Sequence, residues 1–126
     1  MKTEKQTTGQ RGEEEACRYL QGLGQTVMAR NWRSGHLELD IVTFDGKGVH
    51  FVEVKTRTAP VMAEPEANVN RAKRQRMVRA AGSWLAESGK MGLGDVEAFF
   101  DVVSVVLDGD EVNIEYYPEA FIPIYV

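Results

Sequence analysis

Charged side chains alternate along two neighbouring β-rich segments of the sequence. Glu38 and Asp40 are two residues apart in the first segment, and Glu53 and Lys55 are two residues apart in the second. Because side chains alternate between the two faces of a strand, the members of each pair share a face. Carboxylates are ligands of Mg²⁺, and a nearby lysine can hold a water or stabilise negative charge in a transition state. The spacing therefore indicates a site for metal-assisted hydrolysis of a phosphate ester.

The connector Asp45–Gly48 is a strong hairpin signal between the two segments. A turn at its centre would place Asp40 opposite Glu53 and Glu38 opposite Lys55. Opposed Cβ atoms lie only about 4.5–5.5 Å apart. Two carboxylates at that distance in a partly buried sheet repel each other, so a hard divalent cation, Mg²⁺ or Mn²⁺, would compensate their charge.

These charged residues also have ordinary structural explanations. Charges on one face of a sheet usually form a solvated face, although the alternate positions here are rich in Val, Ile and Phe. Glu13 lies with Ala16 and Leu20 on the inward stripe of a predicted helix. It can assist catalysis or interact with free N–H groups at a helix N-terminus, and the sequence leaves both open.

A run of basic residues without acids, R-A-K-R-Q-R-M-V-R, occupies positions 71–79. Such a run in a helix fits contacts with nucleic-acid phosphates, or it forms a solvated face. The net charge of −4 argues mildly against a nucleic-acid partner, but the distribution of charge matters more than its sum. The residues that we expect to contact phosphates are Arg57, Arg71, Lys73, Arg74 and Arg76.

Length and composition restrict the class of protein. A chain of 126 residues, 43% hydrophobic and 27% charged, is typical of one globular domain. No apolar run approaches the roughly 20 residues that span a bilayer, and residues 1–10 lack the apolar core of a signal peptide. The single Cys17 cannot form an internal disulfide, which agrees with a reducing compartment. We therefore expect a cytoplasmic protein with no membrane partner.

Hydrophobic periodicity predicts elements in the order α-β-β-β-α-β-β. Helices are predicted over residues 12–23 and 69–87, and strands over 26–31, 37–44, 49–56, 98–107 and 112–117. The middle strands are apolar on both faces, so helices should cover both sides of a mixed central sheet. Residues 1–10 are expected to be flexible, and residues 57–68 are expected to form a mobile loop.

With these residues in hand, the sequence resembles the bacterial YraN-type family, whose members are similar to archaeal Holliday-junction resolvases. The matching pieces are Gly12-Glu13 with Ala16, Tyr19 and Leu20; Arg30–Arg33; Glu38–Val42; Phe51–Arg57; Lys73; Phe100–Val103; and Ala120-Phe121. The resemblance implies one α/β domain over residues 1–126 with a restriction-endonuclease-like, or tRNA-endonuclease-like, fold. Leu39 departs from the pattern, because a proline usually precedes the aspartate.

The resemblance also implies roles for individual residues. Asp40 and Glu53 correspond to the metal-binding acids of the D…(E/D)-x-K nuclease motif, Lys55 to its lysine, and Glu13 to a helix glutamate that assists the metal. These four are the expected catalytic residues of a Mg²⁺- or Mn²⁺-dependent endonuclease acting on structured or branched DNA rather than RNA. The alternatives are a non-catalytic nucleic-acid-binding or repair-complex module and, third, a protein–protein adaptor, which fits the acidic composition. The sequence does not decide whether the protein forms a homodimer.

Overall fold

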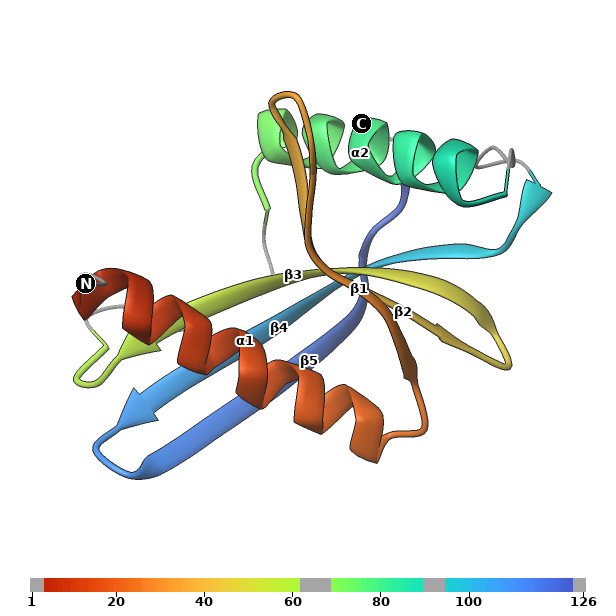
Figure 1. The fold of residues 1–126 in the computed structure, drawn as a ribbon. Helices are drawn as coiled ribbons and strands as arrows, with labels where there is room; N and C mark the ends of the chain where they lie inside the picture. Colours follow the sequence, from red (N-terminus) through yellow and green to blue (C-terminus); the bar gives the residue numbers. More distant parts are fainter. Residues whose placement is uncertain (1–3, 62–68, 90–94, 124–126) are drawn as a thin grey trace.

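The computed structural model describes residues 4–61, 69–89 and 95–123, and it contains the seven predicted elements in the predicted order (Figure 1). They are α1 (Glu4–Gly22), β1 (Thr26–Ser34), β2 (Leu37–Asp45), β3 (Gly48–Thr58), α2 (Arg71–Gly89), β4 (Ala98–Asp108) and β5 (Glu111–Phe121). The prediction of an α/β fold with a mixed central sheet is confirmed.

The five strands form one sheet in the order β1-β2-β3-β4-β5. Neighbouring strands are antiparallel except β3 and β4, which are parallel. Parallel neighbours need a crossover connection, and α2 lies in that connection. Strand β3 is central and carries two of the charged residues selected from the sequence, Glu53 and Lys55.

The two helices cover opposite faces of the sheet (Figure 1). Helix α1 buries Ala16 and Leu20 on one face, and α2 buries Met77, Trp84 and Leu85 on the other. The predicted coverage of both faces is confirmed. Neither helix of the described part of the chain is long and apolar enough to cross a membrane.

Helix α1 begins earlier than the sequence predicts. Residues 4–10, which we expected to be flexible, form its first turns, and the predicted start at residue 12 is wrong. This stretch is polar and has no apolar periodicity, so nothing in its pattern indicates a helix. The helix extends backward from the packed segment around Ala16, because adding residues to an existing helix costs little compared with nucleating one.

The expected loop over residues 57–68 begins later than predicted. Arg57 and Thr58 continue β3, where they pair with Val106 and Leu107 of β4. The apolar and well-buried β4 extends far enough to pair with them, which the sequence of β3 alone does not reveal. Residues 62–68 lie outside the described residues.

Strand β2 changes direction at Asp40. Leu39 packs on the α2 side of the sheet and Ile41 on the α1 side, although alternate residues of a flat strand share a face. The ladder between β2 and β3 ends at Ile41 and Val52, and Asn31 on the other neighbour has a φ of 50°. The β1–β2 hairpin therefore leaves β3 and curls toward α2 (Figure 1).

Candidate functional site

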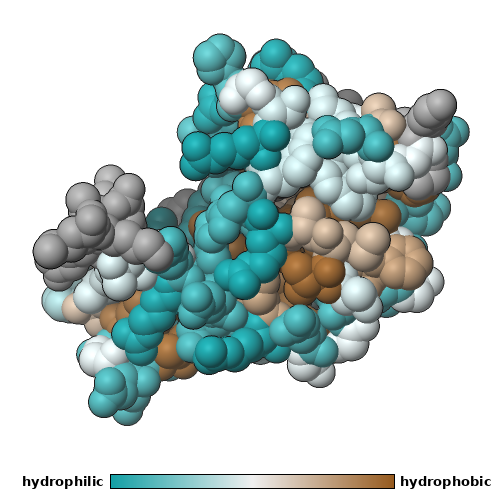
Figure 2. All heavy atoms as spheres, in the orientation of Figure 1, coloured by the Kyte–Doolittle hydropathy of each residue, from teal (hydrophilic) through white to brown (hydrophobic). Residues whose placement is uncertain are grey.

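A cleft of about 560 Å³ opens at the point where β2 leaves β3. In the part of the chain that the structure describes, four carboxylates from three different elements line this acidic cleft: Glu13, Glu38, Asp40 and Glu53. The basic side chain in the lining is Lys73 of α2. Figure 2 shows the surface indented between the regions of α1 and α2, with mostly hydrophilic residues around the indentation. The fold therefore gathers acids that are distant in sequence around one opening.

The predicted hairpin register is confirmed over the five pairs from Asp45–Gly48 to Ile41–Val52. The expected ladder pairs Asp40–Glu53 and Glu38–Lys55 are not part of it, because β2 has already separated from β3. At the separation, Oδ2 of Asp40 accepts a hydrogen bond of 2.9 Å from the backbone N–H of Val54. The carboxylate thus replaces a ladder contact and is fixed beside Glu53 by β3 itself.

Glu53 forms an ion pair with α2. Its Oε1 atom lies 3.2 Å from Nζ of Lys73, and its side chain is only 16% exposed. Burial and the negative charge of Asp40 raise the pKa of Glu53 to about 7, although Lys73 acts in the opposite direction. The cleft therefore holds an acid that changes charge near neutral pH.

Two further acids of the cleft, Asp40 and Glu13, also have raised pKa values. Burial raises the pKa of Asp40, and the hydrogen bond from Val54 opposes that rise. Burial and the charge of Asp40 raise the pKa of Glu13, while a hydrogen bond from the Asn31 side chain lowers it. The common cause is several carboxylates in a partly dehydrated space. Such a group of acids favours any cation that enters.

A close helix–strand contact brings Glu13 to the cleft. Gly12 of α1 is buried against Thr56 of β3, and a Cβ at Gly12 would lie 1.9 Å from Oγ1 of Thr56. Glu13 lies well inside α1, which begins at Glu4, so the alternative that Glu13 interacts with free N–H groups of a helix N-terminus is wrong. Glu13 lines the cleft, so its side chain belongs to this site.

Lys55 lies beside the acidic cleft and not in its lining. It lines a second hollow of about 250 Å³, which adjoins the cleft because both contain Glu53 and Lys73. We call this hollow the basic pocket; its lining residues are Glu53, Lys55, Val69, Asn70, Lys73 and Arg76. The sequence prediction thus placed Lys55 near the right acid, but the lysine that contacts Glu53 in the cleft comes from α2.

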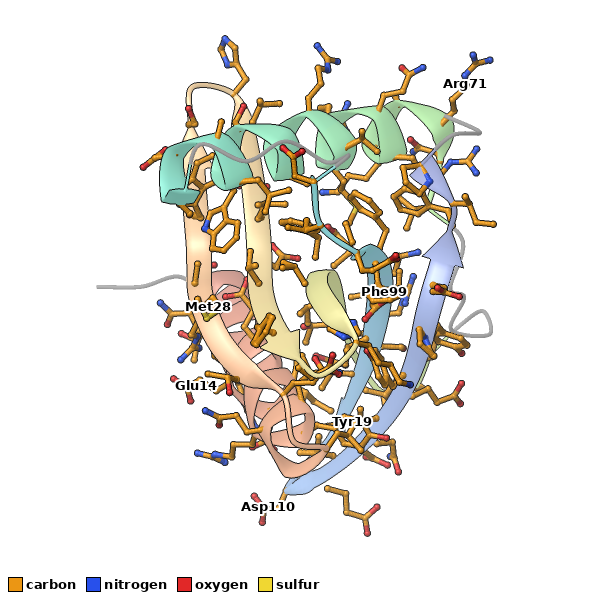
Figure 3. All side chains as sticks on the ribbon, turned by 90° about the vertical axis from the view of Figure 1, so that its right-hand side faces the viewer. Glu14, Tyr19, Met28, Arg71, Phe99 and Asp110 are labelled. Atoms are coloured by element: carbon orange, nitrogen blue, oxygen red, sulfur yellow. The ribbon has the colours of Figure 1, made fainter. Side chains whose placement is uncertain are left out.

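The basic residues of the 71–79 run do not share one solvated face. Arg71 points away from the sheet at the start of α2 (Figure 3), and Arg76 is also exposed. Arg74 instead packs its guanidinium 6.0 Å from the ring centroid of Phe121. Arg57 is half-buried in β3, and its buried Nη1 has no hydrogen-bond partner among the described residues. Of the expected phosphate contacts, Lys73 forms an ion pair with Glu53, and Arg76 lines the same hollow as these two residues.

The donor set of the cleft fits a hard divalent cation. Mg²⁺ is commonly held by one or two carboxylates, with waters and phosphate oxygens as the other ligands. Asp40 and Glu53 line one space, and each has a carboxylate oxygen besides the one engaged with Val54 or Lys73. Among the described residues, no group of three or more His, Cys, Asp or Glu side chains is arranged as a metal site. The fit is therefore to an ion that keeps several waters, and not to an ion enclosed by protein ligands.

Comparison with known proteins identifies the family. Residues 12–105 match the model of the Uncharacterised protein family UPF0102. The chain belongs to the UPF0102 family. It is 46% identical over 100 residues to a UPF0102 protein of Oleidesulfovibrio alaskensis, a match that covers 79% of this chain and 48% of the relative. It is 43% identical over 114 residues to one of Nitratidesulfovibrio vulgaris, covering 90% and 83% of the two chains. A relative from Bacteroides thetaiotaomicron is 39% identical over 115 residues, covering 91% and 92%.

Membership of UPF0102 confirms the YraN-type resemblance found in the sequence. The matched range includes every acid of the cleft as well as Lys73. The sequence left the role of Glu38 open, and the structure places this residue at the cleft. Its Oε2 atom lies 3.5 Å from Nη2 of Arg33 across the β1–β2 hairpin. Sequence reasoning also missed the role of Asn31, whose left-handed backbone is the kind of conformation that asparagine tolerates better than most residues.

Proposed function

We propose that this UPF0102 protein is a metal-dependent nuclease whose active site is the acidic cleft. The single observation that supports this most strongly is the convergence of Asp40 and Glu53 with Lys73 in one opening. Buried carboxylates with raised pKa values next to a fixed cation are typical of sites that bind metal or perform chemistry. The exposed basic residues beside the cleft fit a polyanionic substrate.

Four residues of the cleft have a role in this proposal. Asp40 and Glu53 would hold Mg²⁺ or Mn²⁺. The bound ion would polarise the phosphate and acidify a bound water. Lys73 would stabilise the negative charge that develops on the phosphate oxygens, because its ammonium is already fixed at this position by Glu53. Glu13 would orient a water from α1.

The proposed substrate is DNA with a structured or branched form, and the proposed location is the cytoplasm. An open cleft lined by both helices, β2 and β3 suits a polymer better than a small metabolite. Arg71 and Arg76 are exposed at the same end of α2 as Lys73, so a backbone lying across the cleft would meet positive charge.

A second candidate function is nucleic-acid binding without cleavage. One observation favours it: the ion pair between Lys73 and Glu53 already compensates part of the cleft's negative charge without a metal. In that case, the acids would hold α2 in place and the basic residues would bind phosphates. Metal binding separates the two proposals.

The decisive experiment is a cleavage assay with Mg²⁺ and with Mn²⁺ on single-stranded, duplex, flap and four-way-junction DNA. Glu53→Ala should abolish cleavage, whereas Glu111→Ala, at an exposed position of β5, should cleave as the wild type does. Binding of these substrates without metal-dependent cleavage of any of them would replace the nuclease by the non-catalytic module. Cleavage that survives Glu53→Ala would move the active site away from the cleft.

A further inference from the structure

The basic pocket next to the acidic cleft has its own chemistry. Among the residues that the structure describes, three cationic side chains, Lys55, Lys73 and Arg76, and the amide of Asn70 line it together with one carboxylate, Glu53. The described side chains of the pocket therefore sum to a positive formal charge, and those of the cleft to a negative one. Lysine and arginine side chains are the usual partners of phosphate oxygens.

Side chains supply the formal charge of the basic pocket, and two backbone donors at the start of α2 are already engaged. Asn70 caps that helix: its Oδ1 accepts a hydrogen bond of 2.9 Å from the N–H of Lys73, and its carbonyl oxygen accepts one from the N–H of Arg74. The backbone donors of Lys73 and Arg74 are thus already used. Lys55 reaches the pocket from β3, whereas Lys73 and Arg76 reach it from one face of α2, three residues apart.

The basic pocket and the acidic cleft are directly adjacent. Glu53 and Lys73 belong to both linings, so the ion pair between them forms the boundary. An extended chain of phosphates that places one phosphate in the cleft would bring a neighbouring phosphate to the other side of this boundary. A single phosphate ester bound in the cleft would leave the basic pocket without a ligand.

We infer that the basic pocket binds the phosphate next to the scissile phosphate, so that the substrate is a polynucleotide strand rather than an isolated phosphodiester. The inference rests on the proposed nuclease function and adds the substrate class and the direction in which the strand leaves the cleft, between β3 and the start of α2. It gives Lys55 a different place from the one that its motif implies. Lys55 holds the strand on the far side of Glu53, and Lys73 serves the reacting phosphate.

Binding of a fluorescein-labelled oligothymidylate, measured by fluorescence anisotropy in EDTA over a series of salt concentrations, tests the pocket without requiring cleavage. Arg76→Gln removes an exposed side chain of the pocket, and Arg79→Gln removes an exposed arginine of the same helix that lines neither hollow. Arg76→Gln should bind about tenfold more weakly and lower the salt slope by about one. Arg79→Gln should bind within about twofold of the wild type. Equal losses in the two variants, or no loss in either, would overturn the pocket.

A second measurement separates this inference from the proposed function. With Mn²⁺ present, the ratio of kcat/KM for the oligothymidylate to that for bis(4-nitrophenyl) phosphate should fall about tenfold in Arg76→Gln, because only the longer substrate reaches the pocket. An unchanged ratio with cleavage intact would overturn the basic pocket and leave the nuclease standing. A selective loss of oligonucleotide binding in a protein that cleaves neither substrate would support the pocket and count against the nuclease.

Discussion

Nζ of Lys73 lies 3.2 Å from Oε1 of Glu53, so α2 delivers a positive charge to the strand that carries the most strongly perturbed acid of the cleft. Glu53 belongs to β3, and Lys73 belongs to α2, which lies within the crossover from β3 to β4. This contact joins the helix to the sheet at the site and sets the electrostatic balance of the cleft.

Removing the charge of Lys73 should lower the stability of the folded protein. Lys73→Met should lower the free energy of unfolding at pH 8 by about 1–3 kcal/mol, because Glu53 and Asp40 then repel each other without a cation between the helix and the sheet. Arg79→Met on the exposed side of α2 should change it by less than about 0.5 kcal/mol. Urea denaturation measures both. The double variant Glu53→Gln with Lys73→Met should recover most of the loss; no recovery would show that Lys73 stabilises by packing alone.

Metal binding should raise the melting temperature, because the ion stabilises the folded state. Only that state brings Asp40 and Glu53 together. At a free Mn²⁺ concentration of about 100 times Kd, linkage adds about 2.7 kcal/mol of stability. Asp40→Asn should lose this shift and be no less stable without metal, because an amide oxygen can still accept the hydrogen bond from Val54. Asp110→Asn, at an exposed turn, should keep the full shift. Equal shifts in both variants would place the metal elsewhere.

Stability should depend on pH through Glu53. Its pKa is about 7 in the folded protein against an ordinary value of 4.5, so the folded state binds more protons between these values. The free energy of unfolding should therefore fall as pH rises from about 4.5 to about 7, by at most about 3 kcal/mol from this group, and level off above. Asp40 and His50, with raised pKa values, act in the same direction. The difference between wild type and Glu53→Gln isolates the acid; parallel pH profiles would contradict the raised pKa.

Much of the secondary structure and strand pairing could be predicted because local sequence patterns determine it. Period-two alternation and the Asp45–Gly48 turn predicted the hairpin and its register, and the structure confirms five pairs of it. The apolar run of β4 predicted a strand covered on both faces, and its residues belong to both core clusters, Phe100 on the α2 side and Val103 and Val105 on the α1 side. These features depend on neighbours in the sequence.

The geometry of the site could not be predicted in the same way. The departure of β2 at Asp40 follows from a sheet that twists and from the left-handed backbone at Asn31, and neither leaves a periodic signal. Lys73 contacts Glu53 only because α2 crosses back over the sheet, which fixes its rotation by packing of Met77 and Leu85. A basic run therefore predicted the charge of α2 but not which of its side chains would face the acids.

The contact between α1 and β3 gives a further test of how Glu13 is held. At Gly12, an added Cβ would lie 1.9 Å from Oγ1, 2.6 Å from Cγ2 and 2.7 Å from Cβ of Thr56, and the last of these atoms cannot rotate away. Gly12→Ala should therefore push α1 off the strand and cost about 1–3 kcal/mol of stability. Gly9→Ala offers a matched control in the same helix, because nothing lies within 4 Å of its added Cβ. That substitution should stabilise the protein by up to about 1 kcal/mol, since alanine favours the helix.

The same pair of variants tests whether α1 positions the acid for metal binding. If Gly12→Ala displaces Glu13 from the cleft, the Mn²⁺-induced rise in melting temperature should shrink in this variant and persist in Gly9→Ala. Adding Thr56→Ala to Gly12→Ala removes the two closest contacts and leaves the one to Cβ, so it should restore part of both the stability and the metal-induced shift. Differential scanning fluorimetry with and without Mn²⁺ gives both quantities at once. A Gly12→Ala variant as stable as the wild type would mean that α1 does not depend on this close contact, and a lost stability with an undiminished metal shift would remove Glu13 from the metal's surroundings.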